Sequence, residues 1–536
     1  MTATETAPYR SEVQPGRDGF AQLLRAEWTK IRTVRSWRVG LALAALLTIG
    51  LGVLTSIGGT MSCSDSPTGP SLTGAACRRV PPLGPDGSAV SDSFYLVHQS
   101  MTGDGSITVR VTSLTGLYSA TGGIAAGGST AGMVSGTQPW SKAGVIIKQS
   151  TAQGSSYAAM MTTGGNGVRM QYDYTHDIAG NTGTVSATSP QWLRLTRSGD
   201  TVTGYDSADG AHWTEVGTAT LSGLSGTVQA GLFTASPDHT VQSQSFGGSS
   251  MEGGPSQATG TFDDVALQGS WKPGGWTGTA VGGGGPLGGQ SPLQQSYQDS
   301  AGTFTVSGSG DIAPADGQQT GQPVERALIG TFAGLIALIV VAALFITTEY
   351  RRGLIRLTLA ASPRRGRVLA AKAVVVGAAG FTAGLVAAAV SIPVADHFAY
   401  DHGSYILPIS TLTGARLIVG TAGIFAVVAV LALALGTLLR RSAATVTLVI
   451  VAIVLPYILA TASVLPEGAA EWLTRLTPAA AFSIQQSLIP YAQVTASYTP
   501  DNGYYPLAPL AGFAVLCAYA ALALGLAFRR LRKADA

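Results

Sequence analysis

The chain has 536 residues, of which 46% are apolar and only 11% are charged. Because a soluble protein carries roughly a quarter charged residues, this composition excludes an ordinary soluble globular protein and indicates a membrane protein. The net charge of +3 is unevenly distributed. Residues 61–326 contain ten Lys/Arg against eighteen Asp/Glu, whereas the rest of the chain contains twenty-two against eleven. This asymmetry predicts that the two parts face different solvents.

Six stretches have the length and apolarity of a membrane-spanning helix, which needs about 20 mostly apolar residues. The predicted spans are 39–59, 327–347, 369–390, 417–438, 443–465 and 507–528. The first is too long for the apolar core of a signal peptide, and nearly forty residues precede it. The sequence therefore predicts a six-helix transmembrane bundle.

Basic residues gather on one set of the segments that flank these spans. They are Arg25, Lys30, Arg32, Arg35 and Arg38 before the first span, Arg351 to Arg367 after the second, Arg440 and Arg441 after the fourth, and Arg529 to Lys533 after the sixth. The positive-inside rule then predicts a multi-pass protein of the cell membrane with both termini in the cytoplasm. The acidic block lies outside, between the first two spans. The loop 348–368 and the tail 529–536 are cytoplasmic.

The cytoplasmic segment 1–38 ends in "DGFAQLLRAEWTKIRTVRSWR", in which Phe20, Leu24, Ile31 and Val34 recur at helical spacing and bases fill much of the other face. This pattern predicts an amphipathic elbow helix that lies flat in the interface. The alternative is a simple extension of the first span. On the other side, 466–506 is too polar to span and is broken by prolines, which predicts short re-entrant helices in an extracellular loop packed on the spans or on a dimer partner.

The predicted spans contain almost no charge. Lys372 and Arg416 stand at helix ends, where we expect them to snorkel toward water. This argues against an ion-coupled carrier and against a voltage sensor. A phosphate-binding P-loop requires a Gly-Lys pair, and the sequence contains none. The chain is therefore expected to bind no nucleotide or other cofactor itself.

Residues 60–269 are rich in Gly, Ser and Thr and contain short alternating segments such as "SITVRV" at 106–111. Regular short strands with Gly/Asp turns predict an all-β antiparallel sandwich. Cys63 and Cys77 lie in this block, where an oxidising location favours a disulfide; two free thiols are the alternative. No Cys/His spacing predicts a metal site. Residues 270–326 are Gly-, Pro- and Gln-rich and predict a flexible tether, in which "GTFTVSGSG" is compatible with one strand.

Four segments together resemble the membrane subunits of ABC-2 type exporters, in the form common in actinobacteria. They are "AEWTKIRTVRSW", "TTEYRRGLIRLTLAASPRRGRVLAAKAVV", "LLRRSAATV" and "LTRLTPAAAFSIQQ". The resemblance implies an elbow helix, six spans, a dimer with a second permease subunit (homo- or heterodimer) and coupling to a separate ABC ATPase that holds ATP and Mg. It implies docking through the loop 348–368. The residues that would carry this coupling are Glu349, Tyr350, Arg351, Arg352, Gly353, Arg356, Pro363, Arg364 and Arg365.

The run from "DSFYLVHQS" to "AHWTEVG" is similar to concanavalin-like (laminin-G-like) jelly rolls. This similarity implies a lectin-type sandwich, on which Trp140, Tyr172 and Tyr174 could stack on an envelope glycan. The alternative is that these three rings are core residues. Paired carboxylates of a sandwich glycosidase are absent from the sequence, which argues against hydrolysis.

Two functions share this architecture. The first is the permease subunit of an ATP-driven exporter, not itself an enzyme, with a lectin-like extracellular domain. The second is a non-transporting envelope-sensing receptor or mechanotransmitter. Six spans exceed what an adhesive anchor needs. Expected partners are the ATPase, a second permease subunit, membrane lipid and an envelope glycan, with no nucleic acid.

Overall fold

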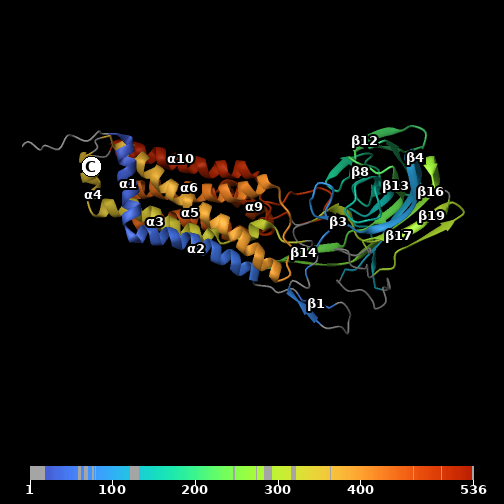
Figure 1. Ribbon diagram of the computed structural model, residues 1–536, viewed down its shortest axis with the longest axis horizontal. Helices are drawn as coiled ribbons and strands as arrows, with labels where there is room; N and C mark the ends of the chain where they lie inside the picture. The colour runs from blue at the N-terminus through green and yellow to red at the C-terminus, as the bar shows by residue number, and fades with distance from the viewer. Residues whose placement is uncertain are drawn as a thin grey trace, which may run out of the picture.

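The structure is a computed structural model. It describes residues 19–57, 62–64, 71–74, 78, 80–120, 132–245, 248–272, 274–282, 293–315, 321–361, 364–462, 464–496 and 498–533. Figure 1 shows an elongated molecule, with a bundle of long helices at one end and a β sandwich at the other. The predicted combination of a helical membrane bundle and an antiparallel β domain is confirmed.

Six helical segments in the described part of the chain are long and apolar enough to cross a membrane. They are α2 (Arg35–Ile57), α3 (Thr331–Arg351) with η3 (Val324–Leu328) before it, α5 (Arg365–Asp401), α6 (Thr411–Leu439), α7 (Ser442–Val449) continued by η4 (Ile450–Val454) and α8 (Leu455–Thr461), and α10 (Pro509–Lys533). Each overlaps one of the stretches predicted from apolar run length. The helix α5 has 37 residues, so it extends beyond the predicted span at both ends.

Five shorter helical elements in the described part of the chain lie outside these segments. They are α1 (Phe20–Thr33), α4 (Leu354–Ala361), α9 (Glu467–Leu476) and the 3-10 helices η5 (Pro478–Gln485) and η6 (Pro500–Asn502). Val34 is extended, with φ −82° and ψ 112°, and separates α1 from α2. The helix α1 is therefore no simple extension of the first span, and Figure 1 shows it running across the end of the bundle. All eight residues of η5 are buried.

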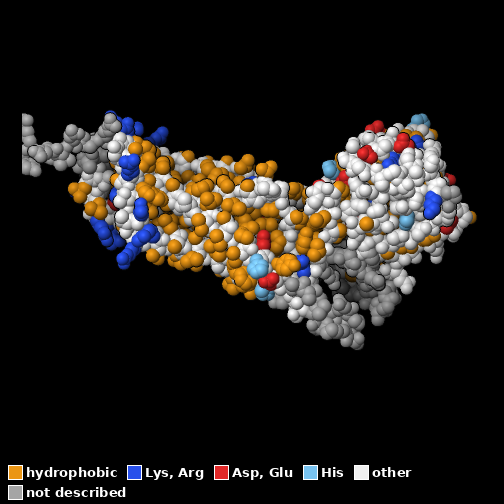
Figure 2. Space-filling view, viewed as in Figure 1, with side chains coloured by type: hydrophobic (Ala, Val, Ile, Leu, Met, Phe, Trp, Pro, Cys, Tyr) orange, Lys and Arg blue, Asp and Glu red, His pale blue; other side chains and the backbone are white. Residues whose placement is uncertain are grey.

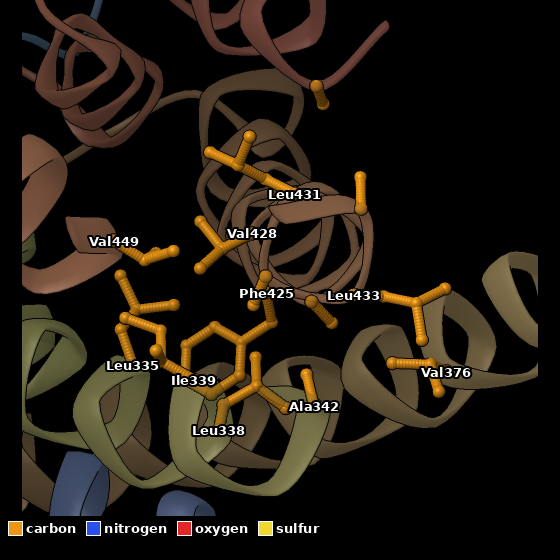
Figure 3. Packing of buried hydrophobic residues seen from close by; sticks show 14 of the residues in the cluster. Leu335, Leu338, Ile339, Ala342, Val376, Phe425, Val428, Leu431, Leu433 and Val449 are labelled. Atoms are coloured by element: carbon orange, nitrogen blue, oxygen red, sulfur yellow. The ribbon is translucent and has the colours of Figure 1, made fainter. Parts of the chain in front are cut away.

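The core of the bundle forms where α3, α5 and α6 meet. Figure 3 shows Phe425 of α6 pointing toward Leu338 and Ile339 of α3. A Cβ added to Gly384 of α5 would lie 2.8 Å from Cγ of Phe425, so glycine is what permits this close approach. By contrast, only 28% of the most apolar windows of α2 and of α10 is buried, which leaves apolar faces on both helices.

Short antiparallel strands build the β domain. The strands are β1 (Ser62–Ser64), β2 (Ser71–Thr73), β3 (Val90–Asp92), β4 (Phe94–Tyr118), β5 (Val134–Ser135), β6 (Lys142–Lys148), β7 (Tyr157–Thr163), β8 (Val168–Tyr172), β9 (His176–Ala179), β10 (Gln191–Ser198), β11 (Thr201–Ser207), β12 (Thr214–Thr220), β13 (Thr227–Ala235), β14 (His239–Ser245), β15 (Gly248–Gly254), β16 (Ser256–Trp271), β17 (Thr277–Val281), β18 (Ser296–Ser300), β19 (Thr303–Gly308) and β20 (Ile312–Pro314).

The main path of the large sheet runs β12-β11-β10-β4-β13-β6-β7-β8-β9. The long strand β4 also pairs with β16 and β17, so it joins both layers. All residues of β6 and β7 are buried, which places these strands between two apolar clusters. One cluster includes Val145 and Ile147, and the other includes Ile146, as alternation along a strand requires.

The predicted tether 270–326 is wrong for the described residues of that segment. They form β17, which pairs with β4, β18 and β19, of which β19 pairs with β16, and β20, which pairs with β3. Phe304 and Val306 of β19 are buried in the sandwich core. The one strand suggested for "GTFTVSGSG" is present as β19, whereas the Gly-rich composition concealed β17, β18 and β20. The sandwich thus reaches beyond residue 269.

Two lysines at the ends of β6 form ion pairs with the segments where the chain enters and leaves the sandwich. Lys148 Nζ lies 2.8 Å from Asp92 Oδ2 in β3, and both side chains are fully buried. Tyr174 donates its hydroxyl to the same carboxylate, at 2.7 Å. Lys142 pairs with Asp311 beside β20. Burial lowers the pKa of Lys148, although the charge of Asp92 opposes that shift.

The sandwich also contacts the loop between α9 and α10. Gln493 of this loop is buried, and its amide nitrogen lies 3.3 Å from the carbonyl oxygen of Tyr174. Tyr174 therefore connects the Lys148–Asp92 pair to the membrane part through its backbone.

We predict that Asp92→Ala destabilises the protein by about 3–5 kcal/mol, because it leaves Lys148 buried without its carboxylate. Thermal unfolding of the purified full-length chain should show a clearly lower melting temperature. Glu215→Ala is the matched control, because Glu215 is an exposed acid of β12. Equal melting temperatures for the two variants would contradict the structural role of the pair.

Candidate functional site

The end of the helix bundle that lies away from the sandwich is strongly basic. Figure 2 shows lysine and arginine side chains gathered there, beyond the apolar surface of the spans. We call it the basic end, and its exposed members are Arg25, Arg32, Arg35, Arg38, Arg351, Arg352, Arg356, Arg364, Arg440, Arg441, Arg529, Arg530, Arg532 and Lys533. They come from segments far apart in the sequence. The predicted alternation of basic connections therefore has a spatial counterpart on one end of the bundle.

Beneath this surface lies a buried ionic network of four side chains from three helices. Lys372 Nζ of α5 lies 2.7 Å from Glu349 Oε1 of α3 and 2.9 Å from Glu27 Oε2 of α1. Lys30 of α1 lies 2.9 Å from Glu27 Oε1 and 3.0 Å from Glu349 Oε1. Two lysines and two glutamates thus alternate, and each lysine contacts both acids.

Three of the four side chains of this network are buried. The side chains of Lys372, Glu27 and Glu349 are 1%, 3% and 9% exposed. Charges removed from water to this degree are tolerated only when they are paired. Burial alone would lower the pKa of Lys30, but hydrogen bonds and the charges of Glu27 and Glu349 outweigh it, so its pKa is raised. Two lysines and two glutamates match in number, and each has a side chain of opposite charge within 3.0 Å.

The predicted coupling residues fall into two groups. Glu349 faces inward and belongs to the network, so it is not part of an exposed docking surface. Tyr350 is half-buried, and its ring lies 5.1 Å from the guanidinium of Arg440. The side chains of Arg351, Arg352 and Arg356 are exposed.

The helix α4 presents an apolar edge beside these arginines. Ile355 is buried against Leu23, Tyr350 and Val368, and it anchors the helix to the bundle. Leu354 and Leu357 point away and are 44% and 69% exposed. The preceding Gly353 has φ +69°, which glycine adopts without strain and which lets the chain turn from α3 into α4. Pro363 lies outside the described residues.

The expectation that Lys372 snorkels is wrong. Its side chain points into the bundle, where two carboxylates compensate its charge and the Phe345 ring lies 5.1 Å from Nζ. Sequence reasoning also missed Glu27 and Lys30. A signal was present, because Glu27 stands on the apolar face of α1, three residues after Leu24 and four before Ile31. An acid on the buried face of an amphipathic helix requires a buried cation.

The aromatic residues predicted to stack on a glycan are largely internal. Tyr174 is 1% exposed and packs against Tyr157, with ring centroids 4.9 Å apart. Trp140 is 7% exposed. Tyr172 is half-buried, and its ring stacks on His176. Tyr174 and Trp140 are core residues, so neither offers a face to a sugar. The predicted Cys63–Cys77 disulfide depends on Cys77, which lies outside the described residues.

We predict that Lys372→Ala destabilises the protein by about 3–5 kcal/mol, because Glu27 and Glu349 are left buried with Lys30 as their shared cation. Limited trypsin digestion of the purified protein should cleave α1 faster, since α1 loses its ionic contact with α5. Lys533→Ala removes an exposed lysine from the same end and should leave cleavage within α1 unchanged. Equal cleavage of both variants would mean that the network does not hold α1.

Comparison with known proteins places the membrane part. The family described as ABC-2 family transporter protein matches residues 151–536. No curated protein matches the chain. Among solved structures, a functionally unknown protein from Saccharomyces cerevisiae is 14% identical over 37% of this chain and 85% of that chain, with a TM-score of 0.21. Scytalido-glutamic peptidase with a peptide-based transition state analog is 7% identical over 40% of this chain and 98% of that chain, with a TM-score of 0.24. At these TM-scores neither likeness bears on fold or function.

The family match covers more than half of the chain and includes every membrane-spanning helix from α3 to α10. The residues that end α3, form α4 and begin α5 all lie within it. The chain therefore belongs to the ABC-2 family of transporter proteins, and it is a permease-type membrane subunit.

Proposed function

We propose that this chain is the permease subunit of an ATP-driven exporter, with the basic end in the cytoplasm and the sandwich outside the cell. A separate ATPase, which holds ATP and Mg, docks on the loop 348–368. Subunits of this family normally work with an ATPase partner, and the chain has no Gly-Lys pair with which to build a phosphate-binding loop.

The observation that carries this proposal is the shape of α4 and its neighbours. Arg351, Arg352 and Arg356 are exposed beside the exposed side chains of Leu354 and Leu357. Arginine and an apolar anchor on one small element are the composition of an interface centre with a charged rim. The matching surface on the ATPase would be acidic, with an apolar depression for Leu357.

The buried ionic network explains how docking could move the spans. Glu349 lies two residues before Arg351 and binds both α1 and α5. A displacement of the loop would therefore act on three helices together. Because a broken buried ion pair costs several kcal/mol, the helices are expected to move as one unit instead of separating.

The apolar faces of α2 and α10 provide contact surfaces for lipid and for a second permease subunit. Only 28% of each most apolar window is buried within this chain.

In the sandwich, Trp140 and Tyr174 are buried, which argues against a role for these two rings in binding an envelope glycan. A lectin-like role of the sandwich would have to use other surfaces.

A second candidate is the non-transporting receptor or mechanotransmitter. It is favoured by the way the sandwich is attached, since buried pairs hold both its entry and its exit and Gln493 contacts Tyr174. Force on the sandwich would reach the bundle through these contacts. Reconstituted complex that hydrolyses ATP but moves no lipid or amphipathic compound would favour this candidate.

The proposed orientation predicts that a membrane-impermeant amine reagent labels Lys272 but not Lys533 on intact cells. Both lysines are exposed, one in the sandwich and one at the basic end, whereas Lys142, Lys148 and Lys372 are buried. After cell lysis Lys533 should be labelled as well. Mass spectrometry of tryptic peptides locates the label, and labelling of Lys533 alone on intact cells would reverse the orientation.

Charge reversal tests the docking surface. We expect Arg351→Glu with Arg352→Glu to reduce co-purification of the partner ATPase at least about tenfold, because like charges would face each other across the interface. The matched control reverses Arg441 and Arg529, which are exposed at the same end outside α4. Lys272 labelling in both variants checks that insertion is unchanged. Undiminished capture of the ATPase by the first variant would exclude this surface as the dock.

A further inference from the structure

A cavity of about 590 Å³ opens at the basic end between three helices. Phe20 at the start of α1, Arg364, Arg365 and Arg367 at the start of α5, and Phe528 and Arg532 near the end of α10 line it. It is therefore built from segments separated by hundreds of residues in the sequence. Its volume falls in the range of small-molecule sites, roughly 300–1,000 Å³.

The cavity is cationic, and its lining includes no acid. Arg364, Arg367 and Arg532 form no salt bridge with any residue that the structure describes. Arg365 donates a hydrogen bond to the carbonyl oxygen of Leu531, at 3.1 Å, which fixes its guanidinium against the end of α10. A guanidinium binds a phosphate with two parallel hydrogen bonds, so several arginines around one cavity favour a phosphate as its ligand.

The rest of the lining is apolar and leaves room for a chain. The rings of Phe20 and Phe528 and the methyl group of Ala370 form it. Gly366 lies between the charged and apolar parts, and a Cβ there would be 3.2 Å from the Phe528 ring. A ligand that satisfies both parts has a phosphate next to hydrocarbon.

The position of the cavity indicates that such a ligand comes from the membrane. Arg365 and Phe528 belong to the terminal turns of membrane-spanning segments, where lipid headgroups lie. The helix α1 is amphipathic and leaves Trp28 47% and Phe20 38% exposed, as an interfacial helix does. Basic pockets between transmembrane helices at this level bind anionic lipid headgroups.

We propose that this cavity binds the headgroup of an anionic phospholipid, whose phosphate is held by the arginines of α5 and α10 and whose acyl chains leave along Phe20 and Phe528. This assigns Arg364 and Arg365, together with Arg367, to lipid instead of the ATPase. Arg351, Arg352 and Arg356 do not line the cavity and remain on the docking surface. The inference depends on the proposed orientation in one respect only, namely which leaflet of the membrane supplies the lipid.

The test measures lipid binding to the purified full-length protein by native mass spectrometry, with phosphatidylglycerol against phosphatidylcholine. The wild type should prefer phosphatidylglycerol. Arg364→Gln with Arg367→Gln and Arg532→Gln should weaken that binding at least tenfold, at roughly fivefold for each arginine lost near a lipid phosphate. The control is Arg351→Gln with Arg352→Gln and Arg356→Gln, which removes the same charge from the same end and should change affinity less than twofold.

Several outcomes would overturn the proposal. Undiminished phosphatidylglycerol binding by the cavity variant excludes the site, and an equal loss in the control shows attraction to net charge alone. Displacement of the lipid by millimolar inorganic phosphate makes the cavity a site for soluble phosphate. Loss of ATPase co-purification in the cavity variant but not in the control makes it the protein dock. The two proposals therefore fail separately.

A second variant keeps the test informative if the triple glutamine protein does not fold. Ala370→Phe fills the apolar part of the cavity and retains all four arginines. We expect it to lower phosphatidylglycerol binding at least tenfold. The rest of the basic surface should keep its preference for phosphatidylglycerol over phosphatidylcholine. Full binding by a folded Ala370→Phe protein would mean that the lipid lies elsewhere.

Discussion

The arrangement of the membrane part depends on a constraint of electrostatics. Lys372 is 1% exposed within the bundle, and a charge so far from water must be compensated at short range. In this structure the two carboxylates come from the end of α3 and one face of α1, both of which pack against α5 there. The elbow helix therefore cannot drift in the interface as a lipid-held amphipathic helix would. Its position is set by Glu27, and the position of the loop after α3 is set by Glu349.

The same solution recurs in the sandwich, on the side that meets the helix bundle (Figure 1). Lys142 and Lys148 occupy the first and last positions of β6; Lys148 binds Asp92 of β3, and Lys142 binds Asp311, the residue before β20. In both places a buried lysine joins segments that are distant in sequence. Apolar packing accepts volume-conserving substitutions, whereas the loss of one partner from a buried ion pair leaves an uncompensated charge. The chain thus uses buried ion pairs, in the helical part and in the β part, at positions where segments distant in the sequence are held together.

Sequence reasoning succeeded where one property dominates a long stretch. Continuous apolar runs predicted all six spans, and period-2 alternation around Ile107 and Val109 predicted the sandwich. It failed where a local pattern is compatible with two different structures. Composition suggested a tether for 270–326, although Phe304 and Val306 alone suffice to place β19 in the core. A lysine at a span end suggested snorkelling, because no local pattern around Lys372 shows that Glu27, 345 residues earlier, lies beside it. Pairing across such separations is a property of the packed helices and not of any segment.

The division of the basic residues follows from these contacts. The turn at Gly353 sends α4 away from the bundle, so Arg351, Arg352 and Arg356 stay in water beside Leu354 and Leu357. At Arg365 the chain re-enters the bundle as α5, and the arginines of that turn converge with Arg532 around a cavity. One loop thus carries two basic surfaces, because its two ends are attached to different neighbours. Net charge gives the loop its side of the membrane, but attachment to α1, α5 and α10 determines which arginines are available to a protein and which to a lipid.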